Sequence, residues 1–241
     1  MYKIAIGIWM SFVCIAVTAQ AQRTGVEKIL SEKEQSIVSI AALAAGGDLP
    51  KLKIKLNRGL EAGLTVNEIK ELLVHLYAYC GFPRSISGLQ TFMKVLEERK
   101  ARGINDIPGN EASPINEKDN KYKRGKIILG ELTKTAQPET LTGYSAFAPV
   151  IDTFLKEHLF ADIFERNILT YAERELVTIA VISTIGNAEP MLRSHLNICL
   201  NVGLTESQLH QFVRIIKSTV GKKKARSAQK NLVEVLRNKR Q

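Results

Sequence analysis

The chain has 241 residues and a formal net charge of +10; 45% of its residues are hydrophobic and only 6% are aromatic. This length suits one large domain or two small ones, and the scarcity of alternating apolar and polar residues favours an all-α fold over a β-sheet protein. The positive charge is concentrated at residues 222–240, where a buried apolar stripe continues and no nucleic-acid-binding motif occurs. We therefore interpret this charge as a solvated helix face and expect no nucleic acid as a partner.

The first residues have the pattern of a cleavable signal peptide. Lys3 precedes an apolar run at residues 4–17, and Ala19-Gln20-Ala21 forms a small-x-small cleavage site. The pattern predicts a signal peptide over residues 1–21 and a periplasmic or secreted mature chain. An uncleaved anchor is the alternative, but the apolar run is short for a membrane span. No other segment is a candidate span, so we expect no membrane contact after cleavage.

Two cysteines, Cys80 and Cys199, remain after this cleavage. An oxidising compartment permits a disulfide between them but does not require one, and a buried free cysteine is the commoner state on a helix face. Neither belongs to a Cys-x-x-Cys, so the sequence gives no support for a dithiol redox centre.

Helix signals follow one another through the first half of the chain. Capping boxes at Ser31/Glu34 and Thr65/Glu68 predict two helix starts. Further on, Gly81 predicts the end of a helix and Pro83 the start of the next one. The stretch 102–117 is rich in Gly, Pro and Asn and predicts a linker.

After the linker, two more apolar-periodic stretches predict helices. The first has Ile127, Ile128 and Leu132 as its inward-facing residues. The second runs from residue 145 to residue 164 and contains His158.

The stretch 170–209 reads as two helices and the start of a third. Thr170 and Glu173 form a capping box. His195 shares an apolar stripe with Cys199, so its ring should point inward, where an unpaired polar group costs about 1–3 kcal/mol. Glu175 is a candidate partner for this histidine. On the pattern alone, a hydrogen-bonded core histidine remains the simpler interpretation.

An internal repeat relates the two halves of the chain. Residues 29–41 align with 168–180 at an offset of 139, and residues 56–69 align with 196–209 at an offset of 140. The copies differ at key positions: Lys55 stands at the place of His195, and Ser36 at that of Glu175. The repeat predicts a first domain over residues 22–101, a linker over 102–117 and a second domain over 118–241. We expect the two core repeats to pack together as a pseudo-dimer.

Three segments carry a resemblance to a known family. They are EIKELLVHLYAYCGFPRS at residues 68–85, FLKEHLFADIFERNILTYAERELVTIAVI at 154–182 and LRSHLNICLNVGLTESQL at 192–209. In their order and spacing these segments resemble the carboxymuconolactone decarboxylase family, whose fold is the all-α alkylhydroperoxidase-D-like bundle. Residues 118–241 resemble a complete family domain and residues 26–99 the core of a second one.

The resemblance implies two possible chemistries. Peroxidase members of the family carry Cys-x-x-Cys-x-x-x-His, but here Ala188 and Met191 stand at the cysteine positions before His195. An alkylhydroperoxidase or peroxiredoxin-type antioxidant activity is therefore the disfavoured alternative. Decarboxylase members resemble one another in needing no metal or cofactor, which implies cofactor-free decarboxylation of a small carboxylated lactone. A non-catalytic periplasmic protein that binds a small molecule is a further alternative.

The resemblance also suggests roles for individual residues. His195 would be the acid/base, Glu175 would orient it, and His158 matches a family histidine that could donate to an oxyanion. Arg193 or Arg174 could hold a carboxylate, although an exposed helix arginine is the simpler interpretation of each. If the repeats pack as a pseudo-dimer, two residues of the first copy could line the same pocket, namely Tyr79 and Cys80. For Cys80 we favour plain core packing.

The remaining expectations concern metals and partners. The four histidines, His75, His158, His195 and His210, have no metal-ligand spacing, so no metal site is expected. A small-molecule substrate and a homo-oligomer are implied by the resemblance, a trimer of two-repeat chains being one such assembly.

Overall fold

The computed structural model describes residues 28–115 and 120–240, and every regular element in these residues is helical. The all-α class is therefore confirmed. The signal peptide predicted at residues 1–21 lies outside the described residues and stays a prediction. None of the helices described is both long and apolar enough to cross a membrane. In chain order the elements are α1 Glu32–Gly46, α2 Leu49–Glu61, α3 Val66–His75, α4 Tyr77–Ala101, α5 Lys121–Thr133, α6 Gly143–Phe147, α7 Pro149–Thr153, the π-helix η1 Phe154–Phe164, α8 Tyr171–Ile185, α9 Glu189–Asn201, α10 Glu206–Val220 and α11 Lys222–Lys239.

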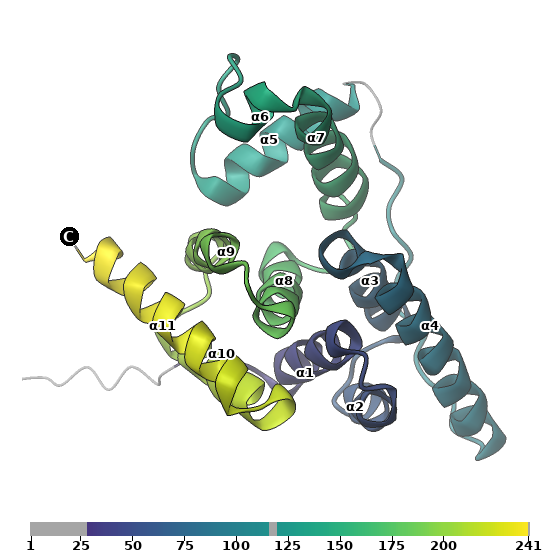
Figure 1. Ribbon diagram of the computed structural model, residues 1–241. Helices are drawn as coiled ribbons and strands as arrows, with labels where there is room; N and C mark the ends of the chain where they lie inside the picture. The colour runs from purple at the N-terminus through teal and green to yellow at the C-terminus, as the bar shows by residue number, and fades with distance from the viewer. Residues whose placement is uncertain (1–27, 116–119, 241) are drawn as a thin grey trace, which may run out of the picture.

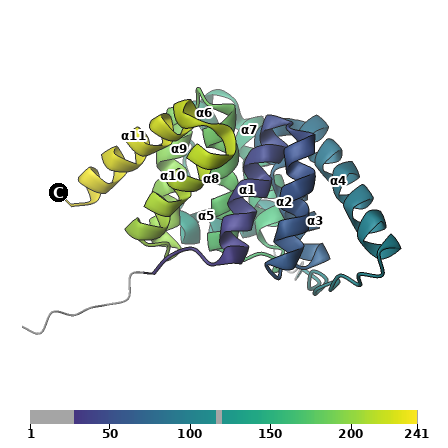
Figure 2. The same cartoon turned by 90° about the horizontal axis from the view of Figure 1, so that it is seen from below.

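Two equivalent helices, α1 and α8, pack against each other at the centre of the molecule (Figure 1). Helices α2, α3 and α4 lie on one side of this pair, and α10 and α11 lie on the other side (Figure 2). Because α1 to α4 correspond to α8 to α11, the two repeats form one bundle with a shared core, which confirms the duplicated arrangement.

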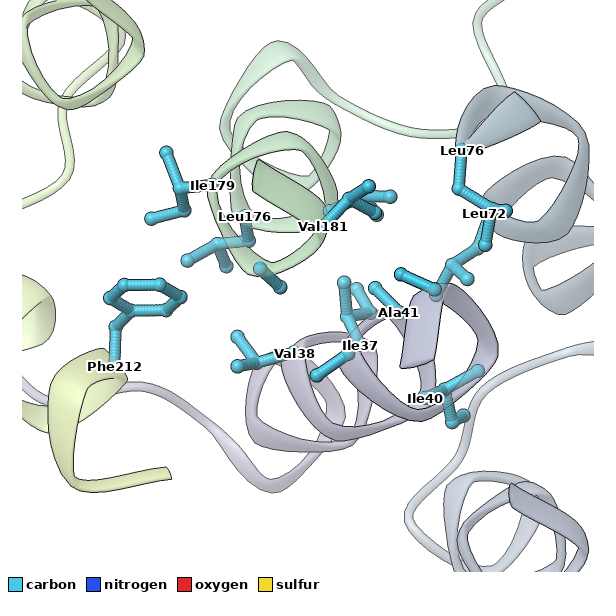
Figure 3. Packing of buried hydrophobic residues seen from close by; sticks show 14 of the residues in the cluster. Ile37, Val38, Ile40, Ala41, Leu72, Leu76, Leu176, Ile179, Val181 and Phe212 are labelled. Carbon is cyan, nitrogen blue, oxygen red and sulfur yellow. The ribbon is translucent and has the colours of Figure 1, made fainter. Parts of the chain in front are cut away.

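The shared core is built from the apolar faces of both repeats. Val38 of α1 faces Leu176 of α8, and Phe212 of α10 closes one end of the contact while Leu72 of α3 closes the other (Figure 3). All four side chains are essentially inaccessible to solvent. Truncating any one of them would leave a cavity in this shared core, so the two repeats form a single packing unit.

The three capping boxes that the sequence predicts are present, and a fourth starts α10. Each N-cap hydroxyl accepts a hydrogen bond from the backbone N–H three residues on, and the side chain there bonds back to the N-cap. The helix starts of the two repeats are therefore set by the same local chemistry. The four boxes are Ser31/Glu34, Thr65/Glu68, Thr170/Glu173 and Thr205/Gln208.

Gly81 interrupts the helical backbone near the start of α4. Its φ of 82° and ψ of 162° lie inside α4, so the helix changes direction there, as the sequence predicts. Gly221, with φ 101° and ψ 169°, makes the equivalent break between α10 and α11. The break lets residues 75–80 of the first repeat lie over α8 and α9 of the second, where the candidate site is found.

The predicted linker runs along the start of α3. The backbone N–H of Val66 donates to the carbonyl of Ile107 at 3.0 Å, and that of Asn67 donates to Pro108 at 2.9 Å. Asp106 pairs with the buried Arg99 of α4 at 2.8 Å. The linker is therefore tied to the first repeat by backbone and ionic contacts.

The helices that precede only the second repeat form a small layer of their own, which lies beside α9 in Figure 1. In α5, Ile128 and Leu132 are buried as expected, but Ile127 is 49% exposed. Adjacent residues of a helix point in different directions, so the face that buries Ile128 and Leu132 leaves Ile127 outside. The expected helix over residues 145–164 is split into α6, α7 and η1, and Pro149 starts α7.

Candidate functional site

His195 and Glu175 form a hydrogen-bonded pair between α9 and α8. The Nδ1 atom of His195 lies 2.8 Å from Oε2 of Glu175. Glu175 is completely buried, whereas 14% of the His195 side chain is exposed. Among the described residues no group is hydrogen-bonded to Nε2 of His195, so this nitrogen is free for a ligand. The sequence suggested this pair, but its chemical role stays a prediction.

Tyr79, from the first repeat, lies against this pair. Its ring meets the His195 ring edge-on, with centroids 5.7 Å apart. The phenol oxygen is buried and has no hydrogen-bond partner among the described residues. Burial, and then the charge of Glu175, raise the pKa of this phenol, so it remains a proton donor at neutral pH. The nearby Thr178 hydroxyl and then the charge of Arg174 act in the opposite direction and offset that rise of the pKa only in part.

Glu175 also has an unpartnered atom. Its Oε1 is buried and accepts no hydrogen bond from any described residue. Two buried polar oxygens without partners therefore belong to one small cluster, since Tyr79 is close enough to Glu175 to respond to its charge. Because buried polar groups in folded proteins are nearly always paired, such a cluster indicates a place where a ligand or water completes the bonding.

A buried ionic network lies behind Tyr79. Glu71 of α3 accepts from Arg174 Nη2 at 2.7 Å and from Arg166 Nε at 3.0 Å. The ring of His75 lies between Arg174 Nη1, at 3.4 Å from Nδ1, and Thr178 Oγ1, at 3.0 Å from Nε2. Burial, followed by the charges of Arg174 and His195, lowers the pKa of His75 well below its usual value, so this ring stays neutral.

This network corrects the interpretation of Arg174. The sequence suggested an exposed arginine or a carboxylate anchor, but the side chain is fully buried. Its Nη2 donates to Glu71 and to the Arg166 carbonyl, which lies 2.6 Å away, while its Nε is buried and has no partner among the described residues. The position falls in the first turn of α8, which reads as exposed from the sequence, but α3 of the other repeat covers it. Arg174 is therefore a buried member of this network and not an exposed helix arginine.

The other predicted arginine and the second predicted histidine make contacts elsewhere in the structure. Arg193 donates to Asn231 at 2.9 Å and lies 3.4 Å from Glu234, both on α11. The His158 side chain is 52% exposed, pairs with Asp162 at 3.1 Å and lies against the ring of Tyr77. No described contact joins either residue to the pair of His195 and Glu175.

Cys80 and Cys199 are both free thiols, and both are poorly suited to act as thiolates. Burial raises the pKa of Cys80 to about 11 although Arg84 acts in the opposite direction, and Cys80 donates to the Leu76 carbonyl at 3.2 Å. Burial, and then Glu175, raise the pKa of the fully buried Cys199 well above its usual value. A catalytic cysteine requires the opposite, a lowered pKa in an accessible position. Within residues 28–115 and 120–240, no cluster of three or more His, Cys, Asp or Glu side chains suits a metal ion.

Two residues of the buried network were missed by the sequence analysis. Glu71 and His75 are four residues apart on α3, and both lie on its buried face beside Leu72. A carboxylate and an imidazole at this helical spacing on an apolar face form a signal that points to a buried partner on another helix. That partner is Arg174, which lies 103 residues from Glu71 along the chain, so the pattern could not identify it.

Comparisons with known proteins agree with the fold and with the repeat. The sequence model of the carboxymuconolactone decarboxylase family matches residues 16–92 and 149–233, once in each repeat and together more than half of the chain. The chain is similar to the 4-carboxymuconolactone decarboxylase of Acinetobacter baylyi, with 29% identity over 96 residues that cover 39% of this chain and 71% of that protein. It is also similar to an uncharacterised protein of Methanocaldococcus jannaschii, with 32% identity over 68 residues that cover 28% of this chain and 64% of that protein. The chain therefore belongs to the carboxymuconolactone decarboxylase family.

Proposed function

We propose that the chain is an acid–base catalyst of the decarboxylase type, in which His195 delivers a proton to the enolate that forms when carbon dioxide leaves. The observation that carries the proposal is the 2.8 Å contact of His195 with the buried Glu175, which leaves Nε2 unpaired. Family membership and the similarity to a 4-carboxymuconolactone decarboxylase support the reaction class. The substrate that we propose is a small carboxylated lactone, and by resemblance the reaction needs no metal or cofactor.

The proposed step is a single proton transfer coupled to loss of carbon dioxide. The bond between the ring carbon and the carboxylate breaks, and its electron pair is delocalised onto the lactone carbonyl as an enolate. The protonated ring of His195 then gives its Nε2 proton to carbon, while Glu175 accepts from Nδ1–H and balances the charge of the imidazolium. The neutral ring that remains regains a proton from water.

Tyr79 is the group we assign to the enolate oxygen. Its hydroxyl is buried, unpartnered and held in its protonated form by burial and by Glu175. A hydrogen-bond donor placed where negative charge develops stabilises the transition state more than the ground state. This assignment makes the site a joint product of both repeats, since Tyr79 comes from the first and His195 from the second.

We assign neither of the arginines that the sequence suggested as an anchor for the substrate carboxylate. Arg174 is used by Glu71, and Arg193 by residues of α11. Loss of carbon dioxide discharges this carboxylate, so a strong ion pair would stabilise the ground state more than the transition state. The proposal therefore assigns proton delivery and oxyanion stabilisation to named residues and assigns no ion pair to the carboxylate.

The properties of the two thiols argue against the alternative function, a thiol peroxidase. The raised pKa values of Cys80 and Cys199 leave little thiolate at neutral pH, and neither thiol has a resolving partner in a Cys-x-x-Cys. Binding of a small molecule without turnover is the alternative that the following experiment addresses.

The test is release of carbon dioxide from 4-carboxymuconolactone by the purified protein and by its His195→Ala variant. Loss of a positioned acid/base should lower the rate by about 10²–10⁴-fold, and added imidazole should restore part of it. In D₂O the product should carry one solvent-derived deuterium on a carbon of the lactone ring. His210→Ala is the matched control. His210 lies on α10, pairs with Glu206 and has no described contact with Glu175.

Two further variants examine the oxyanion assignment. Tyr79→Phe should lower the rate by about 10²-fold, as removal of one oxyanion donor does elsewhere. Tyr77→Phe, two residues earlier in α4 and stacked on Phe82, should not. Turnover that is unchanged in His195→Ala would refute the mechanism, and a wild-type protein that binds the lactone without releasing carbon dioxide would favour the binding role.

Export and assembly remain predictions. The signal sequence predicts a periplasmic or secreted protein, which N-terminal sequencing of the exported chain would test. The family resemblance predicts a homo-oligomer, and sedimentation of the purified protein would give its size.

A further inference from the structure

The repeat implies a position equivalent to the His195 site on the opposite side of the bundle, which we call the twin position. An open pocket of about 360 Å³ lies between α1, α2 and α10, and its lining includes Gln35, Ser36, Ser39, Lys55 and Ile215. With the offsets of 139 and 140, these positions correspond to Arg174, Glu175, Thr178, His195 and His75. The pocket therefore occupies the place, in the other half of the molecule, that the His195 cluster occupies in its own half.

Smaller side chains explain why the twin position is a pocket. Ser36 replaces a glutamate, and at the position of Tyr79 the second repeat has Thr219. Where the Tyr79 ring lies against His195, the twin position therefore has no aromatic ring to fill the space. The resulting volume lies within the range of small-molecule sites, about 300–1,000 Å³.

Two cationic side chains in the lining of the pocket suit a negatively charged ligand. Lys55 and Arg58 lie one turn apart on α2 and both line it. Neither side chain has an ion-pair or hydrogen-bond partner among residues 28–115 and 120–240, unlike that of Lys53 on the same helix, which pairs with Glu98 at 2.6 Å. Burial, and then the nearby charge of Arg58, lower the pKa of Lys55, which a bound anion would oppose. The acid in the lining, Glu32, is exposed and leaves one positive charge in excess.

The neutral groups of the lining add a donor and an apolar wall. The hydroxyl of Ser36 has no described partner, so it can donate to an oxygen of a ligand. The hydroxyls of Ser39 and Ser218 already donate to backbone carbonyls, at 3.0 Å each. Ala62 and Ile215 supply apolar surface. A ligand that matches this set has one carboxylate and a compact apolar body.

We infer that the Lys55 pocket is a binding site for a small organic carboxylate, held by Lys55, Arg58 and Ser36. Unlike the His195 site, it has no buried carboxylate to orient an acid/base, so it binds without proton transfer. The inference does not depend on the proposed decarboxylation, because the two sites share no residue.

Benzoate is a suitable probe, and its amide, benzamide, is the uncharged counterpart of the same shape. Titration of the ¹⁵N-labelled protein at low ionic strength, where charge attraction is least screened, should shift the backbone amide signals of Ser36, Lys55 and Arg58 and reach saturation. Benzamide should not produce saturating shifts. Shifts confined to α8 and α9 would place the binding at the His195 site and overturn the inference.

Variants separate charge from packing. Lys55→Gln should weaken benzoate binding by about tenfold or more, the change that loss of a hydrogen bond to a charged group brings, and Lys55→Arg should keep most of the affinity. Lys94→Gln, which removes an exposed lysine of α4 outside the pocket, should leave the affinity unchanged, as should His195→Ala. If Lys55→Gln does not fold, Arg58→Gln replaces it, because that side chain is exposed. Equal affinity for benzamide, or unchanged affinity in both charge variants, would refute the site.

Discussion

Replacing Glu71 by Gln would remove the charge that neutralises Arg174 while keeping the shape of the side chain. Glu71 is 2% exposed and Arg174 is fully buried, with 2.7 Å between Oε1 and Nη2. Breaking a buried ion pair costs about 3–5 kcal/mol, because the remaining charge stays uncompensated. Arg166, the second partner, is 37% exposed, so its share is only about 0–1 kcal/mol. We expect the free energy of unfolding to fall by about 3–5 kcal/mol, mainly through Arg174.

The opposite side of the bundle shows how the same position can be neutral. Gln211 stands at the place of Glu71 and Gln35 at that of Arg174. Both bond to the backbone of Leu30: Gln35 donates to its carbonyl at 2.8 Å, and Gln211 accepts from its N–H at 2.7 Å. A double variant with Glu71→Gln and Arg174→Gln copies this pair, so it should regain most of the stability lost in Glu71→Gln.

Urea unfolding of the wild type, both single variants and the double variant gives the coupling energy of the pair. In a chain of this size the loss expected for Glu71→Gln corresponds to a fall in melting temperature of about 6–20 °C. A double variant as unstable as the sum of the two single variants would refute the reasoning, because the stability would then come from packing and not from charge compensation.

The other predictions concern single residues. Glu175→Gln should slow turnover but leave the free energy of unfolding within about 1 kcal/mol of the wild type or raise it, because a buried charge with one partner is removed; urea unfolding measures this. The lowered pKa of His75 means that below about pH 6.5 the unfolded chain takes up a proton that the folded chain does not. Stability present above this pH should therefore be lost as the pH falls, and less so in His75→Gln, as urea midpoints against pH would show. Cys80, with its pKa of about 11, should be alkylated by iodoacetamide at pH 7 about 10²-fold more slowly than an ordinary cysteine; a faster reaction would revive the peroxidase alternative. Gly125→Ala should destabilise the protein strongly, because a Cβ there overlaps the backbone of Lys156, whereas Gly130→Ala meets only the Thr135 carbonyl at 3.4 Å and should be close to neutral by thermal unfolding.

The fold was predictable because local signals repeat in the sequence. A capping box such as Thr170/Glu173 fixes a helix start through contacts within four residues, and its copy at Ser31/Glu34 predicts the equivalent start. The pair of His195 and Glu175 was predictable for a related reason, since consecutive antiparallel helices place their inward faces together. These contacts depend on short separations along the chain.

The partners that cross from one repeat to the other were not predictable in the same way. Arg174 reads as exposed because it lies in a first helical turn, yet α3 buries it through Glu71, 103 residues away. Tyr79 was predicted to line the site only on the condition that the repeats pack as a pseudo-dimer. The role that the sequence suggested for His158 depended on the family pattern alone, and in the structure its contacts are with Asp162 and Tyr77. A sequence pattern describes which face of a helix is buried, but not which helix buries it.

The differences between the two halves are correlated, and buried charge explains why. A buried arginine cannot lose its carboxylate partner without a large penalty, so Arg174 and Glu71 on one side correspond to two glutamines on the other, and His75 corresponds to an isoleucine. Once the ionic network is absent, no buried framework remains to hold a ring such as that of Tyr79 against an acid/base. The second site can then exchange His195 for Lys55 and open into a pocket. Duplication within one chain permits this difference, because each of the two positions draws on both repeats, and the proposed proton chemistry requires only the one that contains His195.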